Sequence, residues 1–223
     1  NTQNHLTVGY GLLWQILFAA EFFISVEAQT HGTLNITGKN GSTEEMIEEL
    51  LCGGCDLFLG KIPQSLDSRL KSIPMMHTRL SIFAHESHPL IQRKEANTIF
   101  TLADLRPYKW VIIGSLEDLS GYSISDEFRE SMKIQTIHDI NSIFIVIQIL
   151  QKSDALIMLP VHVGQQLQMY QIHEISDVDI TFEPYVSGLI FRREMEQDPH
   201  LQSLISSLQQ LLLKQELKTE LLS

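Results

Sequence analysis

The feature that most constrains the fold is a recurring pair of segments, a short apolar run bounded by turn residues and a neighbouring segment with helical periodicity. Asp56–Gly60 is such a run, and its apolar residues do not alternate with polar ones, as in a strand buried on both faces of a parallel sheet. The stretch that begins at Ser42 has acidic residues in its first turn and four apolar residues on one face, which predicts a helix. Strands that alternate with helices predict an α/β fold with a parallel sheet.

This alternation occurs twice along the chain, on either side of a polar, helix-poor stretch at residues 85–97. An amphipathic helix that starts at Asp198 and Pro199 closes the chain. Further strands are expected at Leu6–Gly9, Thr33–Thr37, Leu80–Ala84, Trp110–Gly114, Ala155–Pro160 and Tyr185–Phe191, and helices at Leu12–Phe23 and Ile140–Leu150. Two series of this kind, without an internal sequence repeat, predict two similar lobes.

Composition limits the functions that the chain can have. Its 223 residues, 43% of them hydrophobic, are enough to bury a core without disulfides or metals. The 16 basic and 27 acidic side chains give a formal net charge of −11, which repels a phosphate backbone. We therefore expect that this chain does not bind DNA by itself.

The stretch Leu6–Val26 is apolar enough to imitate a signal peptide or a membrane span. Gln15 and Glu21 interrupt it, and no Lys or Arg precedes it. A strand followed by a buried helix is therefore the favoured interpretation. The default location is then cytoplasmic, without a membrane as partner, although the sequence leaves open that it begins inside a longer protein.

Cys52 and Cys55 have the CxxC spacing of zinc sites and redox dithiols. Zinc requires two more ligands, and the chain has no second cysteine pair. Redox cysteines of this type usually gain a low pKa at a helix N-terminus, whereas this pair falls at the end of the predicted helix, where the helix dipole disfavours a thiolate. We expect ordinary small core residues, with no metal and no cofactor.

The sequence also lacks the common enzyme motifs. His85 and His88 are one residue short of the HExxH spacing that places both imidazoles on one helix face. No GxSxG elbow, P-loop or GxGxxG run occurs, and scattered Ser, His and Asp residues do not define a triad. A non-enzymatic binding module is favoured, and an α/β hydrolase or transferase stays open as an alternative.

Four stretches carry a family resemblance, in order along the chain. They are Thr7–Gly9 before a long apolar helix, Glu48–Leu57 with its leucine, glycine and aspartate, Phe83–Leu90 with a His-Pro-Leu turn followed by Thr101–Leu105, and Ala155–Pro160 with its final proline. Together they resemble the effector-binding domain of LysR-type transcriptional regulators, which is itself similar to type 2 periplasmic solute-binding proteins. One departure is Ser153-Asp154-Ala155, where the family usually has a glycine-rich turn.

The resemblance implies an α/β fold of two Rossmann-like lobes joined by crossover strands, like that of type 2 periplasmic binding proteins. Lobe I would comprise residues 5–87 plus 189–215, and lobe II residues 88–188. It also implies a non-enzymatic domain that binds a small-molecule effector in the interlobe cleft, forms a homodimer or tetramer, and reaches DNA only through an N-terminal domain absent from this chain. The alternative from another class is a periplasmic solute-binding protein of a transporter, which uses the same fold.

Candidate site residues lie in strand-to-helix turns, because ligands of open α/β folds collect outside the carboxyl ends of the strands. Ser42, Thr43, Asn141 and Ser142 combine polar side chains with free backbone N–H groups, an arrangement that suits a carboxylate. The alternative is that these residues only cap helices.

The resemblance adds further site residues. In related domains the pocket includes the first strand-helix turn, the start of the second helix, the turn after the first strand of the second lobe and the residue after the strand-ending proline. The matching positions here are Leu12 and Leu13, Thr43, Gly114 and Ser115, and Val161.

Trp14 is expected beside Leu12 and Leu13, on an apolar side of the same cleft. Lys61, just after the third strand, is a candidate cation for an acidic effector, although a solvated surface lysine is the commoner case. Many relatives have serine or threonine in place of Leu13, which suggests a less polar ligand or one that is held elsewhere. We expect the effector to be a carboxylate or an aromatic molecule.

Overall fold

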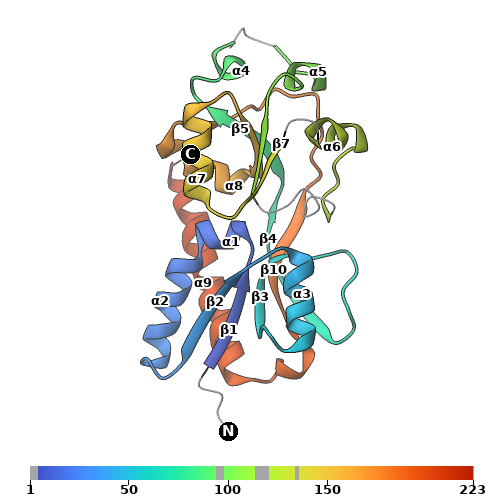
Figure 1. Cartoon of the computed structure of the whole chain (residues 1–223). Helices are drawn as coiled ribbons and strands as arrows, with labels where there is room; N and C mark the ends of the chain where they lie inside the picture. Colours follow the sequence, from blue (N-terminus) through green and yellow to red (C-terminus); the bar gives the residue numbers. More distant parts are fainter. Residues whose placement is uncertain (1–4, 94–97, 114–120, 134–135, 223) are drawn as a thin grey trace. The chain divides into compact units, whose positions relative to one another are not determined.

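The computed structural model describes residues 5–93, 98–113, 121–133 and 136–222, and the chain divides into two compact units (Figure 1). Unit 1 combines the chain up to His77 with the chain from Val186, and unit 2 is Thr78–Tyr185. The lobe boundaries expected after residues 87 and 188 differ from these, because Leu80–His85 is a strand of the second sheet.

Unit 1 is built on the first sheet and the helices that cover it. Its elements are β1 (His5–Tyr10), α1 (Leu12–Leu17), α2 (Ala19–Thr30), β2 (Asn35–Asn40), α3 (Thr43–Cys52), β3 (Leu57–Lys61), β4 (Leu70–Thr78), β10 (Tyr185–Arg192), the 3₁₀ helix η3 (Arg193–Met195) and α9 (Pro199–Leu222). The strand order is β2-β1-β3-β10-β4, with β1 parallel to β2 and β3, and β10 antiparallel to β3. Figure 1 shows α2 and α9 on one face of this sheet and α3 on the other.

Unit 2 repeats this arrangement in a second sheet. Its elements are β5 (Leu80–His85), α4 (Pro89–Gln92), α5 (Leu102–Leu105), β6 (Trp110–Ile113), α6 (Asp126–Lys133), β7 (Thr136–Ile140), α7 (Ile143–Lys152), β8 (Leu156–Pro160), α8 (Val161–Gln166), the 3₁₀ helix η2 (Leu167–Tyr170) and β9 (Ile172–Glu174). The strand order is β7-β6-β8-β5-β9, with β6 parallel to β7 and β8, and β5 antiparallel to β8 and β9. The predicted pair of Rossmann-like α/β folds is thereby confirmed.

The apolar stretch expected as one helix from Leu12 to Phe23 forms two helices, which break at Phe18. Phe18 has φ −135° and ψ −19°, outside the helical region, but its ring centroid lies 4.9 Å from that of the buried Trp14. Aromatic packing in the core thus accompanies the interruption of the helix. Within the described part of the chain, no helix is both long and apolar enough to cross a membrane.

Arg192, at the end of β10, centres a polar network that joins four elements of unit 1. Its guanidinium donates to the carbonyl oxygens of Leu50 and Cys55, at 3.1 and 2.7 Å, and to the carboxylate of Asp56 at 3.1 Å. The other carboxylate oxygen of Asp56 accepts the backbone N–H of Thr7 at 2.8 Å. The guanidinium group therefore fixes the end of α3 and the turn before β3 to β10, and Asp56 extends this network to β1. A lysine has no forked set of donors and would not make the same bonds.

Replacing Arg192 with lysine should therefore destabilise the protein by about 2 kcal/mol, since charge-assisted bonds to half-buried acceptors are lost. Arg193→Lys is the matched control, because the side chain of the exposed Arg193 donates only to the carbonyl oxygen of Ser68 among the described residues. We expect that control to change stability by less than about 0.5 kcal/mol. Urea denaturation measures both, and equal losses in the two variants would contradict the role of Arg192.

His88 is a fully buried residue at the start of α4. Its Nδ1 accepts the N–H of Leu90 at 3.1 Å, and its ring centroid lies 4.4 Å from that of Tyr108. Nδ1 accepts a hydrogen bond only when it carries no proton, so this bond requires the neutral ring. Burial lowers the pKa of His88, and the nearby Asp154 opposes that effect.

Acid should therefore destabilise the protein through His88. A folded-state pKa below the ordinary value of 6.5 means that the unfolded chain binds more protons, so the free energy of unfolding falls as the pH drops below that value. His88→Asn, which keeps a capping side chain without a titratable group, should reduce this loss of stability between about pH 7 and pH 5. Part of the loss persists, because burial lowers the pKa of His162 as well. Denaturation at stepped pH tests this, and an unchanged slope in His88→Asn would contradict it.

Candidate functional site

The carboxyl ends of β1 and β3 meet at one edge of the first sheet, where α1 begins. The N–H of Gly11 donates to the carbonyl oxygen of Leu59 at 2.8 Å and so joins the two strand ends. Leu12 and Leu13, both predicted as site residues, follow directly. Leu12 is partly exposed and Leu13 is buried, so this edge presents one apolar side chain to its surroundings.

The N-terminus of α3 lies at the same edge, because α3 follows β2, which runs parallel to β1. Ser42 is its N-cap: the Ser42 hydroxyl accepts the N–H of Glu45 at 3.2 Å, and the Glu45 carboxylate accepts the N–H of Ser42 at 2.9 Å. The cap predicted at this position is thus confirmed as a capping box. It leaves the N–H groups of Thr43 and Glu44, which lack partners within the helix and point beyond its end.

Lys61 ends β3 at this edge and is half-buried. Burial lowers the pKa of its ammonium group, and the carboxylate of Glu44 opposes that effect. This opposing influence places the ammonium within electrostatic reach of the first turn of α3. A small anion at the edge would meet both a cation and two backbone donors.

Trp14, also predicted to line the site, lies in the core with an exposed fraction of 0%. Its indole N–H donates to the hydroxyl of Ser187 at 2.8 Å, and that hydroxyl donates to the carbonyl oxygen of Gly60 at 2.8 Å. The packing around Gly60 is tight, because a Cβ there would lie 2.1 Å from the ring of Phe58. Trp14 therefore packs in the core behind the residues of this edge. A direct contact of Trp14 with an effector stays a prediction.

The predicted residues of unit 2 lie at the carboxyl ends of β7 and β8, which both run parallel to β6 and therefore end at one edge. Val161 follows the proline that ends β8 and is partly exposed. Asn141 and Ser142 precede α7, and the Ser142 side chain makes no capping bond there. Gly114 and Ser115 lie outside the described residues.

Of the two cysteines, only Cys55 is a core residue, and Cys52 is exposed. The Cys55 thiol accepts the N–H of Gly9 and donates to the carbonyl oxygen of Leu57 at 2.8 Å, and burial raises its pKa. A raised pKa keeps the group a thiol at neutral pH, which disfavours nucleophilic or redox chemistry. Among the described residues, no three His, Cys, Asp or Glu side chains are placed to hold a metal ion.

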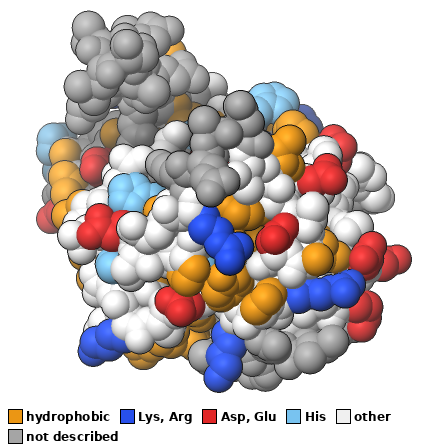
Figure 2. All heavy atoms as spheres, turned by 90° about the horizontal axis from the view of Figure 1, so that it is seen from above, with side chains coloured by type: hydrophobic (Ala, Val, Ile, Leu, Met, Phe, Trp, Pro, Cys, Tyr) orange, Lys and Arg blue, Asp and Glu red, His pale blue; other side chains and the backbone are white. Residues whose placement is uncertain are grey.

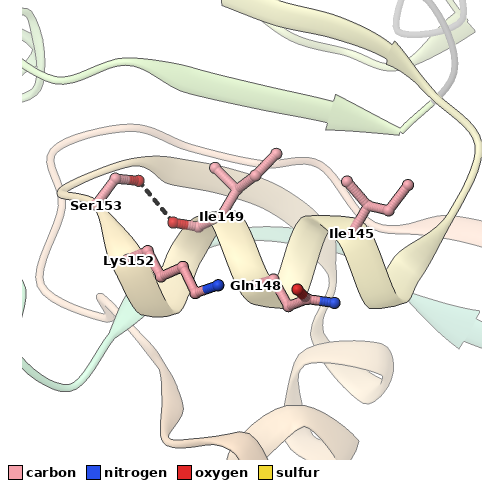
Figure 3. Close-up of a pocket in the computed structure, with 5 residues that line it drawn as sticks. All are labelled: Ile145, Gln148, Ile149, Lys152 and Ser153. Carbon is pink, nitrogen blue, oxygen red and sulfur yellow. Dashed lines mark hydrogen bonds between the residues drawn. The ribbon is translucent and has the colours of Figure 1, made fainter.

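A shallow hollow of about 390 Å³ lies on the surface of α7, and none of the predicted site residues lines it. It is lined by Ile145, Gln148, Ile149, Lys152 and Ser153 (Figure 3). Ile145, Gln148 and Ile149 belong to the apolar helix expected at Ile140–Leu150, and Lys152 and Ser153 follow it. Nothing in the periodicity of the helix indicates that part of its apolar surface stays exposed, and so the hollow was missed.

Comparison with known proteins decides between the functions considered for this architecture. Residues 27–213 match the family model of the LysR substrate binding domain. The chain belongs to this family. It is the effector-sensing domain of a LysR-type transcriptional regulator. Domains of the family are not enzymes, and a transporter's periplasmic binding protein is not favoured.

Solved structures of LysR-family regulators share the fold. A full-length variant of BenM is 18% identical with a TM-score of 0.68, covering 97% of this chain and 70% of that one. The BenM effector binding domain with its effector benzoate is 18% identical with a TM-score of 0.65, covering 95% and 93%. Reduced OxyR from N. meningitidis is 15% identical with a TM-score of 0.68, covering 93% and 95%. The comparison with curated proteins found no match.

The capping box separates two roles that the sequence had left open for neighbouring residues. Ser42→Ala removes the side chain that accepts the Glu45 N–H, so it should destabilise the protein by about 1 kcal/mol. Thr43→Ala leaves the capping box intact and should change stability by less than about 0.5 kcal/mol. Thermal denaturation of both variants tests this. A larger loss in Thr43→Ala than in Ser42→Ala would show that Thr43 is the structural residue.

Proposed function

We propose that this chain binds a small apolar carboxylate or aromatic effector at the carboxyl edge of the first sheet. The supporting observation is that a half-buried lysine, an open helix N-terminus and a partly exposed leucine meet at that edge, at Lys61, Thr43 and Leu12. Effector contacts by Val161 and by the Asn141-Ser142 pair of unit 2 stay predictions from the sequence. Effector binding in a cytoplasmic regulator would then change how the DNA-bound protein acts on transcription.

The charges at this edge favour a ligand with a single negative group. The Lys61 ammonium, the Thr43 hydroxyl and the N–H groups of Thr43 and Glu44 can bind the two oxygens of one carboxylate. The carboxylates of Glu44 and Glu45 belong to the same helix end and would repel a second negative charge. An apolar monocarboxylate therefore suits the edge better than a dicarboxylate or a phosphate ester. The BenM domain was solved with benzoate, which has this chemistry.

The proposal predicts that Thr43→Ala weakens the binding of a monocarboxylate. A thermal-shift screen of small carboxylic acids and aromatics, with benzoate included, identifies a ligand for wild type. Titration calorimetry should then show an affinity loss of about tenfold in Thr43→Ala, equivalent to about 1.4 kcal/mol for one charge-assisted hydrogen bond. Ser42→Ala is the control, which should lower the melting temperature and change the affinity less. Equal affinities in wild type and Thr43→Ala would show that the Thr43 hydroxyl does not contact the carboxylate.

We also propose that the chain forms a homodimer, and its exposed apolar side chains support this. On α2, Ile24 is 66% exposed and lies one turn from the exposed Glu27. On α7, Phe144 is 64% and Ile145 52% exposed, and the helix ends at Lys152. Neighbouring exposed apolar side chains on a helix, such as Phe144 and Ile145, are typical of interaction surfaces. The α2 face carries an acidic side chain and the α7 face ends in a lysine, so the two faces have opposite charges. We therefore expect α2 of one copy to contact α7 of the other, and a two-fold axis to repeat this contact.

Single charges on either face should dissociate this dimer. We expect Ile24→Asp and Phe144→Asp each to be monomeric, and their equimolar mixture to recover dimers, because one of the two contacts in the mixed dimer joins unchanged faces. Met169→Asp is the control, since Met169 is 78% exposed on η2 and lies outside both faces. Light scattering reports the mass against 25.4 kDa for one chain. A monomeric wild type at micromolar concentration would show that the proposal is wrong.

Contact with DNA is proposed to lie outside this chain, in the N-terminal domain expected from the sequence. The formal net charge of −11 supplies no general attraction to a phosphate backbone. Figure 2 shows basic and acidic side chains interspersed over the described residues of one face, so positive charge does not gather there. The chain's part in regulation would then be to sense the effector and to assemble copies.

A further inference from the structure

Two buried hydroxyl groups mark the places where the chain passes between its units. Thr78 is the first residue of unit 2, and Ser187 is the second residue of unit 1 after the chain returns. Their exposed fractions are 5% and 1%. A buried hydroxyl group requires a hydrogen-bond partner, and each of these has a ring nitrogen as one partner.

In unit 1, Ser187 joins the return strand β10 to the start of α1. Its hydroxyl accepts the indole N–H of Trp14 at 2.8 Å and donates to the carbonyl oxygen of Gly60 at 2.8 Å. Ser187 also pairs with Lys61 across the β3–β10 ladder. The hydroxyl thus lies between the two segments of unit 1 that carry the proposed contacts of α1 and β3.

The chain crosses from unit 1 to unit 2 at the end of β4 and returns at the start of β10, and these two places are its crossovers. In unit 2, Thr78 joins the outgoing crossover to the start of α8. Its hydroxyl bonds Nδ1 of His162 at 3.0 Å, and the next residue, Arg79, accepts the N–H of Val161 on its carbonyl oxygen at 3.0 Å. The start of α8, with the proposed contact Val161, is therefore held by two hydrogen bonds to the crossover. The ring nitrogen again belongs to a residue beside a proposed effector contact.

We propose that Ser187 and Thr78 are positioning residues of the effector site, which tie the two crossovers of the chain to the segments that contact the effector. The proposal rests on the site proposed for the effector. A shift of either crossover must carry the contact segment along or leave a buried polar group without its partner, which is unfavourable at low dielectric. Effector binding therefore changes the free energy of moving a crossover, and movement of a crossover changes the affinity for the effector by the same free energy.

Buried hydroxyl groups elsewhere in the chain offer matched controls. Ser81 and Ser207 are each 2% exposed. Ser81 donates to the carboxylate of Glu174 on the adjacent strand β9, and Ser207 bonds within its own helix to the carbonyl oxygen of Ser203. Both are as buried as the crossover hydroxyl groups, and neither bonds a residue of α1 or α8, although Glu174 also accepts a hydrogen bond from Arg79.

The test uses variants that remove or retain each crossover bond. Thr78→Val removes the hydroxyl at nearly constant volume, and Thr78→Ser retains it. Ser187→Ala removes the bond in unit 1, and Trp14→Phe removes the same bond while Ser187 keeps its partner Gly60. Trp14→Phe therefore tests the bond even if Ser187→Ala does not fold. Ser81→Ala and Ser207→Ala are the controls.

Native-state hydrogen exchange should rise only in the segment that each bond holds. We expect amide exchange about tenfold faster in residues 161–166 for Thr78→Val and in residues 12–17 for Ser187→Ala and Trp14→Phe, with α3 unchanged. Thr78→Ser and both controls should match wild type in these segments. Unchanged exchange in the crossover variants, or the same increase in the controls, would overturn the proposal.

A second measurement addresses the crossovers themselves. Spin labels at the exposed Glu48 of unit 1 and Gln151 of unit 2, in a Cys52→Ser background, report the distribution of distances between the units. The distribution should broaden in Thr78→Val and Trp14→Phe and stay unchanged in the controls, and an unchanged width in both crossover variants would overturn the proposal. Neither measurement uses an effector, so failure to find a binding carboxylate is a separate result that concerns the site alone.

Discussion

Strand β10 is fixed near both of its ends by buried polar contacts, and the rest of unit 1 depends on this. Near its start, Ser187 bonds Trp14 and the end of β3, and at its end Arg192 bonds Cys55 and Asp56 in the turn before β3. Between them, Gly188 passes so close to β4 that a Cβ would lie 2.1 Å from the carbonyl oxygen of Ile73. With β10 held in this register, β1 and β3 end at one level, and the residues that follow them form the candidate site.

The elements that the sequence predicted best are those with short-range causes. The capping box at Ser42 needs only a glutamate three residues away, and β3 and β8 are apolar runs with turn residues on both sides. The break at Phe18 was not predicted, because the whole stretch is apolar and the packing of its rings decides where the helix ends. The unit boundary differs from the expected lobe boundary for a similar reason. Leu80–His85 has the pattern of any buried strand, and only its pairing with β8 and β9 assigns it to unit 2.

The candidate site was predictable to the extent that it follows strand ends. Thr43 and Lys61 come directly after strands or caps that the sequence shows, so their place at one edge follows from a parallel sheet. The burial of Trp14 could not be predicted, because its partner Ser187 is 173 residues away in the sequence. The same limit applies to Arg192 and Asp56, which are 136 residues apart. The sequence around an aromatic or charged side chain does not indicate which distant residue it contacts in the folded protein.

The central claim is that a carboxylate effector binds at the carboxyl edge of the first sheet. The most direct test is a crystal structure of the chain with the carboxylic acid that stabilises it most in thermal-shift screening. The account predicts carboxylate oxygens within hydrogen-bonding distance, about 3 Å, of the N–H groups of Thr43 and Glu44, with Lys61 beside them. A carboxylate bound in the hollow on α7, or at any place away from the N-terminus of α3, would contradict it.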